Sequence, residues 1–192
     1  TEEQLIFPHD ASIREYRELT PIARKWLQRW RVRLNARSDQ KGQLPWWSLF
    51  RVDAADDRRP RVVWADLARS PRAAVINAGD RVVPLNSCYI AFAQTLDEAH
   101  ALAVWLNSPL AAAWLAALAE PARGGFRRML GWTVGLLPIP RDWEHAVERL
   151  APYGARAAAG DVPGNDELLD VTLNALGAAT HDVESLLTWG HR

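Results

Sequence analysis

The chain has 192 residues, of which 48% are hydrophobic and 24% are charged, and this length is enough for one substantial domain. Its single cysteine, Cys88, excludes an internal disulfide and a cysteine-based zinc site. The formal net charge is zero, but residues 1–141 carry 20 Lys and Arg against 14 Asp and Glu, whereas residues 142–192 carry 3 against 9. Charge is therefore unevenly distributed, and local positive runs decide whether a surface attracts phosphate.

The first predicted elements are a short strand at residues 5–7 and a basic helix. Thr20 as the N-cap and Pro21 at the first helical position indicate where the helix begins. Six Lys and Arg and no acid lie between residues 24 and 37. A loop rich in hydrogen-bonding side chains follows at 38–50 and contains two adjacent tryptophans.

The middle of the chain alternates short strands with turns before two helices. Runs of β-branched and aromatic residues predict strands at 61–67, 73–77 and 88–94. Thr95 and Glu98 form a capping-box pattern, which predicts a helix from there to about Asn107. Ser108 and the proline after it restart a second helix, which reaches about Ala119.

The last third is predicted to contain an edge or terminal strand at 134–140 and two helices at 142–158 and 164–189. The predicted fold class is therefore mixed α+β: a small mixed or antiparallel sheet flanked by helices, with a helical C-terminal extension. We expect two parts, residues 1–141 as a binding domain and residues 142–192 as an extension. The extension is expected to pack on the first part or on a further domain.

Nothing in the sequence indicates a membrane segment or a leader. Residues 101–119 come nearest to a membrane span, but they are alanine-rich and interrupted by Asn107, Ser108 and Pro109. The N-terminus lacks the basic and apolar regions of a signal peptide. We therefore expect a cytoplasmic protein and, because the chain begins without Met, a piece of a longer one.

The sequence contains few residues in the patterns typical of catalysis. The sequence has no glycine-rich nucleotide loop, no Gly-x-Ser-x-Gly elbow and no His-x-x-x-His pair for a metal, and its five histidines are scattered. Asp56 and Asp57 are adjacent and precede two arginines, which is typical of a solvated turn. We expect no catalytic residue, no metal site and no cofactor in this chain.

Residues 121–129, "PARGGFRRM", are the most informative short segment. Glycines let the main chain approach a ligand and expose its N–H groups, while arginines bind phosphate or guanine edges. Phe126 either stacks on a ligand or anchors the loop. The alternative interpretation is an ordinary helix C-cap followed by surface arginines.

Seven segments in a fixed order carry a resemblance to a known family. They are "LIFPHD", "PIARKWLQRWRVRLNARSDQKGQLPWWSLFR", "PRVVWADLARSPRAAVI", "PLNSCYIAF", "LAVWLNSPLAAAWL", "GGFRRM" and "GLLPIP". The series resembles the C-terminal target-recognition domain of bacterial N6-adenine-specific DNA methyltransferases, the TaqI-like specificity domains of type II and IIG restriction-modification systems and of related phage-defence methyltransferases. The resemblance covers roughly residues 4–143, and its specificity comes from order and spacing, not from any single motif.

The resemblance implies a DNA-recognition module. Such a domain binds double-stranded DNA beside a methyltransferase domain of the same parent chain, which flips adenine and transfers a methyl group from S-adenosylmethionine. The Asn/Asp-Pro-Pro-Tyr/Phe tetrapeptide of that catalytic domain is absent here, and so is its cofactor motif, so the chain would recognise DNA without being an enzyme by itself.

Under this hypothesis the DNA contacts form one continuous positive wall. Arginines supply contacts to phosphates or grooves, and the polar residues ahead of the paired tryptophans, together with those around the turn after the second middle strand, are candidates for base edges. The candidates are Arg123, Gly124, Gly125, Arg127, Arg128, Arg58, Arg59, Arg61, Gln40, Lys41, Gln43, Asn77 and Arg81.

Two other classes of function stay open. The tryptophan-rich and oppositely charged parts also suit a protein-interaction module with no nucleic-acid role. A small hydrolase of unfamiliar type would need converging carboxylates or histidines in a cleft.

Overall fold

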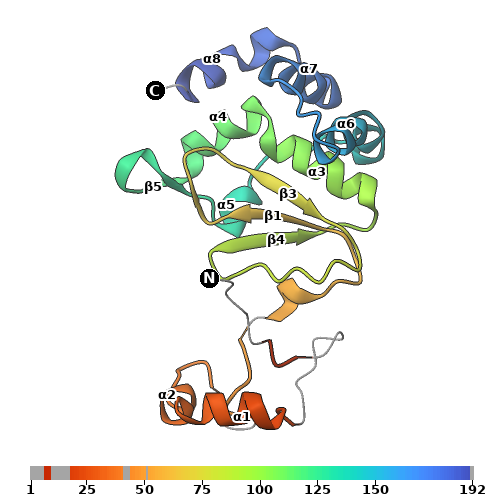
Figure 1. Ribbon diagram of the computed structural model, residues 1–192. Coiled ribbons are helices and arrows are strands. Elements are labelled where there is room, and N and C mark those ends of the chain that lie inside the picture. Colours follow the sequence, from red (N-terminus) through yellow and green to blue (C-terminus); the bar gives the residue numbers. More distant parts are fainter. Residues whose placement is uncertain (1–6, 10–17, 41–43, 51, 191–192) are drawn as a thin grey trace. The chain divides into compact units, whose positions relative to one another are not determined.

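Figure 1 shows the computed structural model, which describes residues 7–9, 18–40, 44–50 and 52–190. The chain divides into two compact units, residues 1–56 and residues 57–192. Residues 142–192 belong to the second unit. The two units are described separately below.

The first unit contains two short helices, α1 (Pro21–Gln28) and α2 (Arg31–Asn35), and the 3₁₀ turn η1 (Val52–Ala55). The predicted N-cap is confirmed, because the Thr20 hydroxyl accepts a hydrogen bond from the Ala23 N–H at 3.3 Å. Between α1 and α2 the Trp30 N–H bonds to the Leu27 carbonyl at 2.8 Å, a tighter turn than an α-helix makes. The strand expected at 5–7 lies largely outside the described residues.

Arg37 joins the end of α2 to the segment that follows it. Its guanidinium donates to the Leu34 carbonyl at 3.0 Å and to the Ser48 carbonyl at 2.6 Å. The rings of Trp46 and Trp47 meet edge to face, with centroids 5.4 Å apart, and both side chains are partly buried. The paired tryptophans therefore pack against each other within this unit.

The second unit is built on an antiparallel sheet of three strands in the order β3 (Ala73–Ile76), β1 (Arg61–Ala65) and β4 (Cys88–Phe92). The three predicted strands are confirmed, and of the two arrangements expected, mixed or antiparallel, the sheet has the antiparallel one. Val62 and Trp64 of β1 are buried on the face that packs on helices. Because successive side chains of a strand point to opposite faces, this alternation sets the register of the sheet.

Helices α3 (Leu96–Asn107) and α4 (Pro109–Leu118) cover that face (Figure 1). Thr95 caps α3 as predicted, accepting from the Glu98 N–H at 3.1 Å, and the Glu98 carboxylate accepts from the Gln94 N–H. Ser108 ends α3 and caps α4, so the two helices meet at 62°. No single helix among the described residues has the length and apolar character needed to cross a membrane.

The segment after α4 differs from two expectations. The glycine-rich basic segment is a β-hairpin in a second three-stranded sheet, in the order β2 (Leu67–Ala68), β6 (Arg127–Arg128) and β5 (Glu120–Pro121). The strand predicted at 134–140 is wrong, because helix α5 (Gly131–Val134) and helical turns occupy its start. Two prolines at its end lack the N–H that a strand ladder needs.

Three helices complete the second unit: α6 (Trp143–Ala158), α7 (Asn165–Leu176) and α8 (Thr180–Gly190). The single helix predicted at 164–189 is wrong, because Gly177 adopts a left-handed conformation with φ of 68° and ends α7. The Ala178 N–H then bonds to the Leu173 carbonyl at 3.0 Å, as in a Schellman motif.

Two apolar cores hold the second unit together. The first lies between the sheet and α3 and α4, and the second joins α3 and α4 to α6 and α7 around the buried Trp105 and Leu150. Helices α3 and α4 thus form the middle layer between the sheet and the C-terminal helices (Figure 1). The C-terminal extension therefore packs on this chain's own helices.

Candidate nucleic-acid interface

The hairpin of residues 120–128 is the centre of the candidate site. Its strands pair with Glu120 opposite Arg128 and Pro121 opposite Arg127, and the Ala122 N–H bonds to the Phe126 carbonyl at 2.7 Å. The tip contains Gly124 and Gly125, with φ of 73° and 76°. Glycine adopts this left-handed conformation without steric cost, so the paired glycines are explained by the turn.

The base of the hairpin is anchored in the first core. Strand β6 pairs with β2, with Leu67 opposite Arg128. The Met129 N–H bonds to the Asp66 carbonyl at 2.6 Å, and the Met129 carbonyl accepts from the indole N–H of Trp64 at 2.9 Å. Met129 and Trp64 are both buried, so a stable element positions the exposed tip.

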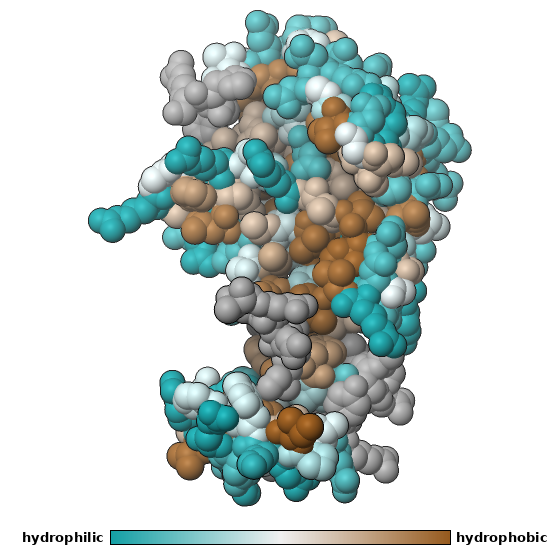
Figure 2. Space-filling model, in the orientation of Figure 1, coloured by the Kyte–Doolittle hydropathy of each residue, from teal (hydrophilic) through white to brown (hydrophobic). Residues whose placement is uncertain are grey.

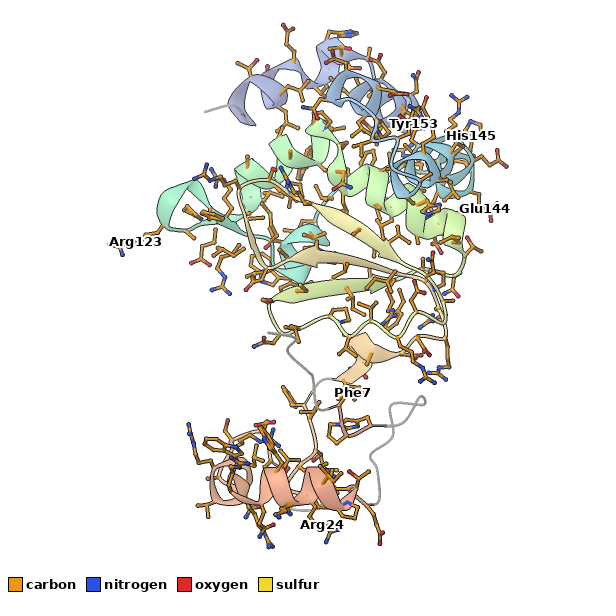
Figure 3. All side chains as sticks on the ribbon, in the orientation of Figure 1. Phe7, Arg24, Arg123, Glu144, His145 and Tyr153 are labelled. Carbon is orange, nitrogen blue, oxygen red and sulfur yellow. The ribbon has the colours of Figure 1, made fainter. Side chains whose placement is uncertain are left out.

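The arginines of the hairpin have different environments. Arg123 is exposed at the tip, points away from the sheet in Figure 3, and has no hydrogen bond or ion pair with the described residues. Arg128 is exposed and forms an ion pair with Asp66 at 2.9 Å. Arg127 is partly buried and donates to the Ala119 carbonyl at 3.0 Å, which holds the hairpin to the end of α4. Arg123 is therefore the arginine most available to a ligand.

Phe126 is partly buried, and it contacts an arginine that the sequence analysis missed. The guanidinium of Arg69 lies 5.3 Å from the centre of the Phe126 ring. Arg72, three residues later, is also exposed. The pairing of β2 with β6 brings Arg69 to the hairpin, and no local signal in the sequence reveals a pairing over sixty residues. The hydrophilic projection at the left of Figure 2 corresponds to this hairpin.

A second set of candidates lies where β1 begins. Arg58 and Arg59 are exposed there, with the Arg59 guanidinium 4.8 Å from the Phe92 ring centre. Asn77 and Arg81 are exposed in the turn after β3. The side-chain amide of Asn77 donates to the Asp80 carboxylate at 3.1 Å, so this group stabilises the turn.

The prediction that Arg61 contacts DNA is wrong. Its side chain is fully buried, with 0% exposure, and donates to the backbone carbonyls of Val82 at 3.0 Å and Asp80 at 2.8 Å. A guanidinium enclosed in this way cannot contact DNA, because its donors point into the loop that it holds. Arg61 is therefore a structural residue.

The structure places the candidates of the second unit in two groups, one at each end of β1. Arg58 and Arg59 precede the first residue of β1, whereas the strand that pairs with the hairpin follows its last residue. At about 3.3 Å per residue, the five residues of β1 span roughly 13 Å between these two ends. The hairpin and the start of β1 are thus two separate positive groups.

The remaining candidates belong to the first unit. The amide of Gln40 donates to the carbonyls of Leu44 at 2.8 Å and Pro45 at 3.1 Å, so it closes its own loop. Lys41 and Gln43 lie outside the described residues.

The described residues show no concentration of catalytic groups at the hairpin. No three His, Cys, Asp or Glu side chains among them are placed to hold a metal ion. A cavity of about 300 Å³ lies between the sheet, α3 and α5, and its walls include Trp64, Leu102 and Ile139 and contain no ionisable side chain. The cavity therefore offers no group for acid–base catalysis.

In comparisons with known proteins, no family model matches the chain and no curated protein matches it.

Proposed function

We propose that the chain is the DNA-recognition module of an N6-adenine-specific DNA methyltransferase and that its hairpin enters a groove of double-stranded DNA. The observation that carries the proposal is the tip of the hairpin, where exposed Arg123 adjoins two glycines in left-handed conformations. A two-stranded β-ribbon fits the major groove of B-form DNA, and an arginine can bind guanine through two hydrogen bonds there.

The charge around the hairpin also supports a polyanionic ligand. Five arginines belong to the hairpin or its neighbouring segment, and they are Arg69, Arg72, Arg123, Arg127 and Arg128. Two acids lie beside these arginines: Asp66, which directly precedes β2, and Glu120 on β5. The excess of positive charge favours phosphate, and the anchored base limits the entropy lost when the tip binds.

The rest of the proposal comes from the resemblance in sequence. It includes a separate catalytic domain in the same parent chain, S-adenosylmethionine as the cofactor of that domain and adenine as the methylated base. The proposed cytoplasmic location comes instead from the N-terminus, which lacks the features of a signal peptide. A catalytic tetrapeptide of the Asn-Pro-Pro-Tyr type in the parent gene product is expected, and its absence there would contradict this part of the proposal.

Binding of the full chain to a fluorescent DNA duplex at several salt concentrations tests the role of the hairpin. We expect a dissociation constant of about 10⁻⁴ to 10⁻⁶ M for the isolated chain, with the logarithm of affinity falling by roughly 0.9 per contacted phosphate as the logarithm of salt rises. Arg123→Ala should weaken binding by about 1–3 kcal/mol if Arg123 contacts a base. If it contacts a phosphate, the salt slope should fall by about 0.9.

Arg149→Ala is the matched control, because it removes the same charge from an exposed position on α6. It should leave both affinity and salt slope unchanged. Equal effects of the two substitutions would show that the hairpin has no special part in binding.

A protein-interaction module is the second candidate function, and one observation favours it. Trp132, Leu136 and Ile139 are large apolar side chains with more than half of their surface exposed, and Ile139 also lines the cavity beside α5. Exposed apolar groups gathered in one segment commonly mark protein contacts. This function predicts that neutralising Arg123, Arg127 and Arg128 leaves DNA binding unchanged, whereas Trp132→Ala weakens association with a protein partner.

A further inference from the structure

Residues 20–37, called the α1–α2 arm below, carry an unusual surface. Six Lys and Arg and no Asp or Glu lie between residues 24 and 37. None of the residues of α1 or α2 is buried. Large apolar side chains are exposed on the arm as well, including Trp26 at 46% and Trp30 at 40%. In Figure 2 hydrophobic atoms lie among hydrophilic ones over α1 and α2.

The two indoles and the arginines form ordered pairs. The Arg29 guanidinium lies 5.4 Å from the centre of the Trp26 ring, and the Arg33 guanidinium lies 5.6 Å from that of Trp30. Trp26 belongs to α1, and Trp30 lies in the turn between α1 and α2. Each exposed aromatic ring is therefore accompanied by a positive charge.

These pairs distinguish between the polyanions that a basic surface can bind. Duplex DNA offers phosphates but keeps the faces of its bases stacked inside. A helix that lies on an anionic membrane keeps its cations and its apolar side chains on opposite faces, whereas here a guanidinium lies within about 6 Å of the centre of each indole. A single strand offers both phosphates for the cations and free base faces for the indoles.

We propose that the α1–α2 arm binds single-stranded nucleic acid, with unpaired bases stacked on Trp26 and Trp30 and phosphates held by the neighbouring arginines. The site lies in the first unit and uses residues that the duplex function does not need. It goes beyond the proposed function, and either can fail without the other.

The test compares two strands of equal length and charge, an oligothymidylate of about twenty nucleotides and an abasic strand that has the same phosphates. Both are titrated against the full chain. Oligothymidylate should bind at least about tenfold more tightly, because stacking on aromatic side chains stabilises each bound base. The double substitution Trp26→Ala, Trp30→Ala should remove that difference while leaving binding of the abasic strand unchanged.

Two further variants serve as controls: one keeps the aromatic rings of the arm, and the other changes the hairpin of residues 120–128. Trp26→Phe, Trp30→Phe keeps aromatic faces and should retain most of the preference for oligothymidylate. Since Trp26 and Trp30 are both exposed, neither double substitution opens a core, and unchanged circular dichroism should show this. Arg123→Ala should leave oligothymidylate binding unchanged, whatever its effect on the duplex.

Three results would overturn the proposal. The first is equal affinity for the thymidylate and abasic strands, which would show binding by charge alone. The second is an unchanged preference in the double alanine variant. The third is binding to phosphatidylserine vesicles, lost in the alanine variant, without any preference for the strand that has bases; this would assign the arm to a membrane surface.

Discussion

Arg61 and Arg123 show that arginine has two different roles in this chain, one structural and one at the surface. Arg61 is fully buried, and its donors hold the carbonyls of Val82 and Asp80. Arg123 is exposed at a turn and has no hydrogen bond or ion pair with the described residues. A buried guanidinium needs partners because its desolvation is costly, whereas an exposed one keeps its donors for water or a ligand. Burial therefore decides which arginines are available to a ligand.

A second residue-scale feature is the ion pairing at the end of α6. Arg156 donates to the Asp161 carboxylate at 2.7 Å and to the Glu167 carboxylate, and so connects α6 to α7. The hydrogen bond from Arg156 and the charge of its guanidinium hold the pKa of Asp161 below its usual value. The same hydrogen bonds raise the pKa of Arg156.

Asp161→Asn tests the pH dependence of this ion pair. Because the pKa of Asp161 is lower in the folded state, its contribution to stability is present above the unfolded-state pKa and disappears as the pH falls through the folded-state pKa. We expect the variant to unfold at lower urea concentration than the parent chain near neutral pH, with the gap closing below the folded-state pKa. Asp170→Asn, an exposed change on α7, should show no such closing gap.

At the element scale, the contact of α3 with α6 depends on one glycine. A Cβ atom added to Gly154 of α6 would lie 2.6 Å from the Cβ and 2.6 Å from the carbonyl oxygen of His100 on α3. Such distances cannot be tolerated, and the obstructing oxygen belongs to the backbone. The helices approach closely because α6 has no side chain at this position.

Gly154→Ala should therefore separate α3 from α6 and disturb the second core. We expect a loss of unfolding free energy of about 1–3 kcal/mol, in the range measured for overpacked interiors. Ala155→Ser, at the exposed neighbouring position, should change it by less than about 0.5 kcal/mol. Urea unfolding followed by circular dichroism measures both, and equal stability of the two variants would contradict the close contact.

At the scale of the whole molecule, the division after residue 56 separates the two proposed binding sites. The hairpin and both apolar cores lie in the second unit, whereas the α1–α2 arm lies in the first. Hydrogen bonds form within each unit, for example between Arg37 and Ser48 in the first and between Arg61 and Asp80 in the second. We expect the second unit to be an independent folding unit.

Expression of residues 57–192 alone checks this division. The fragment should unfold in one cooperative transition, detected at the same temperature by circular dichroism and tryptophan fluorescence. It should keep the Arg123-dependent part of duplex binding and lose any preference for oligothymidylate over the abasic strand. A fragment without a cooperative transition would show that residues 1–56 are needed to complete the core.

Several local features could be predicted from sequence because neighbouring residues determine them. The caps at Thr20, Thr95 and Ser108 and the three middle strands depend on side chains within a few positions of each element. The errors at 134–140 and at Gly177 are also local. At 134–140 helical turns and two prolines replace the predicted strand, and at Gly177 a left-handed glycine ends a helix that apolar periodicity alone would continue.

The candidate site could be predicted only in part. The sequence alone determined an α+β fold, the positions of most helix caps and the concentration of arginine and glycine at 121–129. Tertiary structure alone decided that Arg61 is buried, that Arg69 joins the hairpin through the pairing of β2 with β6, and that the start of β1 lies apart from the tip. The physical reason is range: caps and turns depend on adjacent backbone groups, whereas burial and strand pairing depend on residues brought together by the chain as a whole.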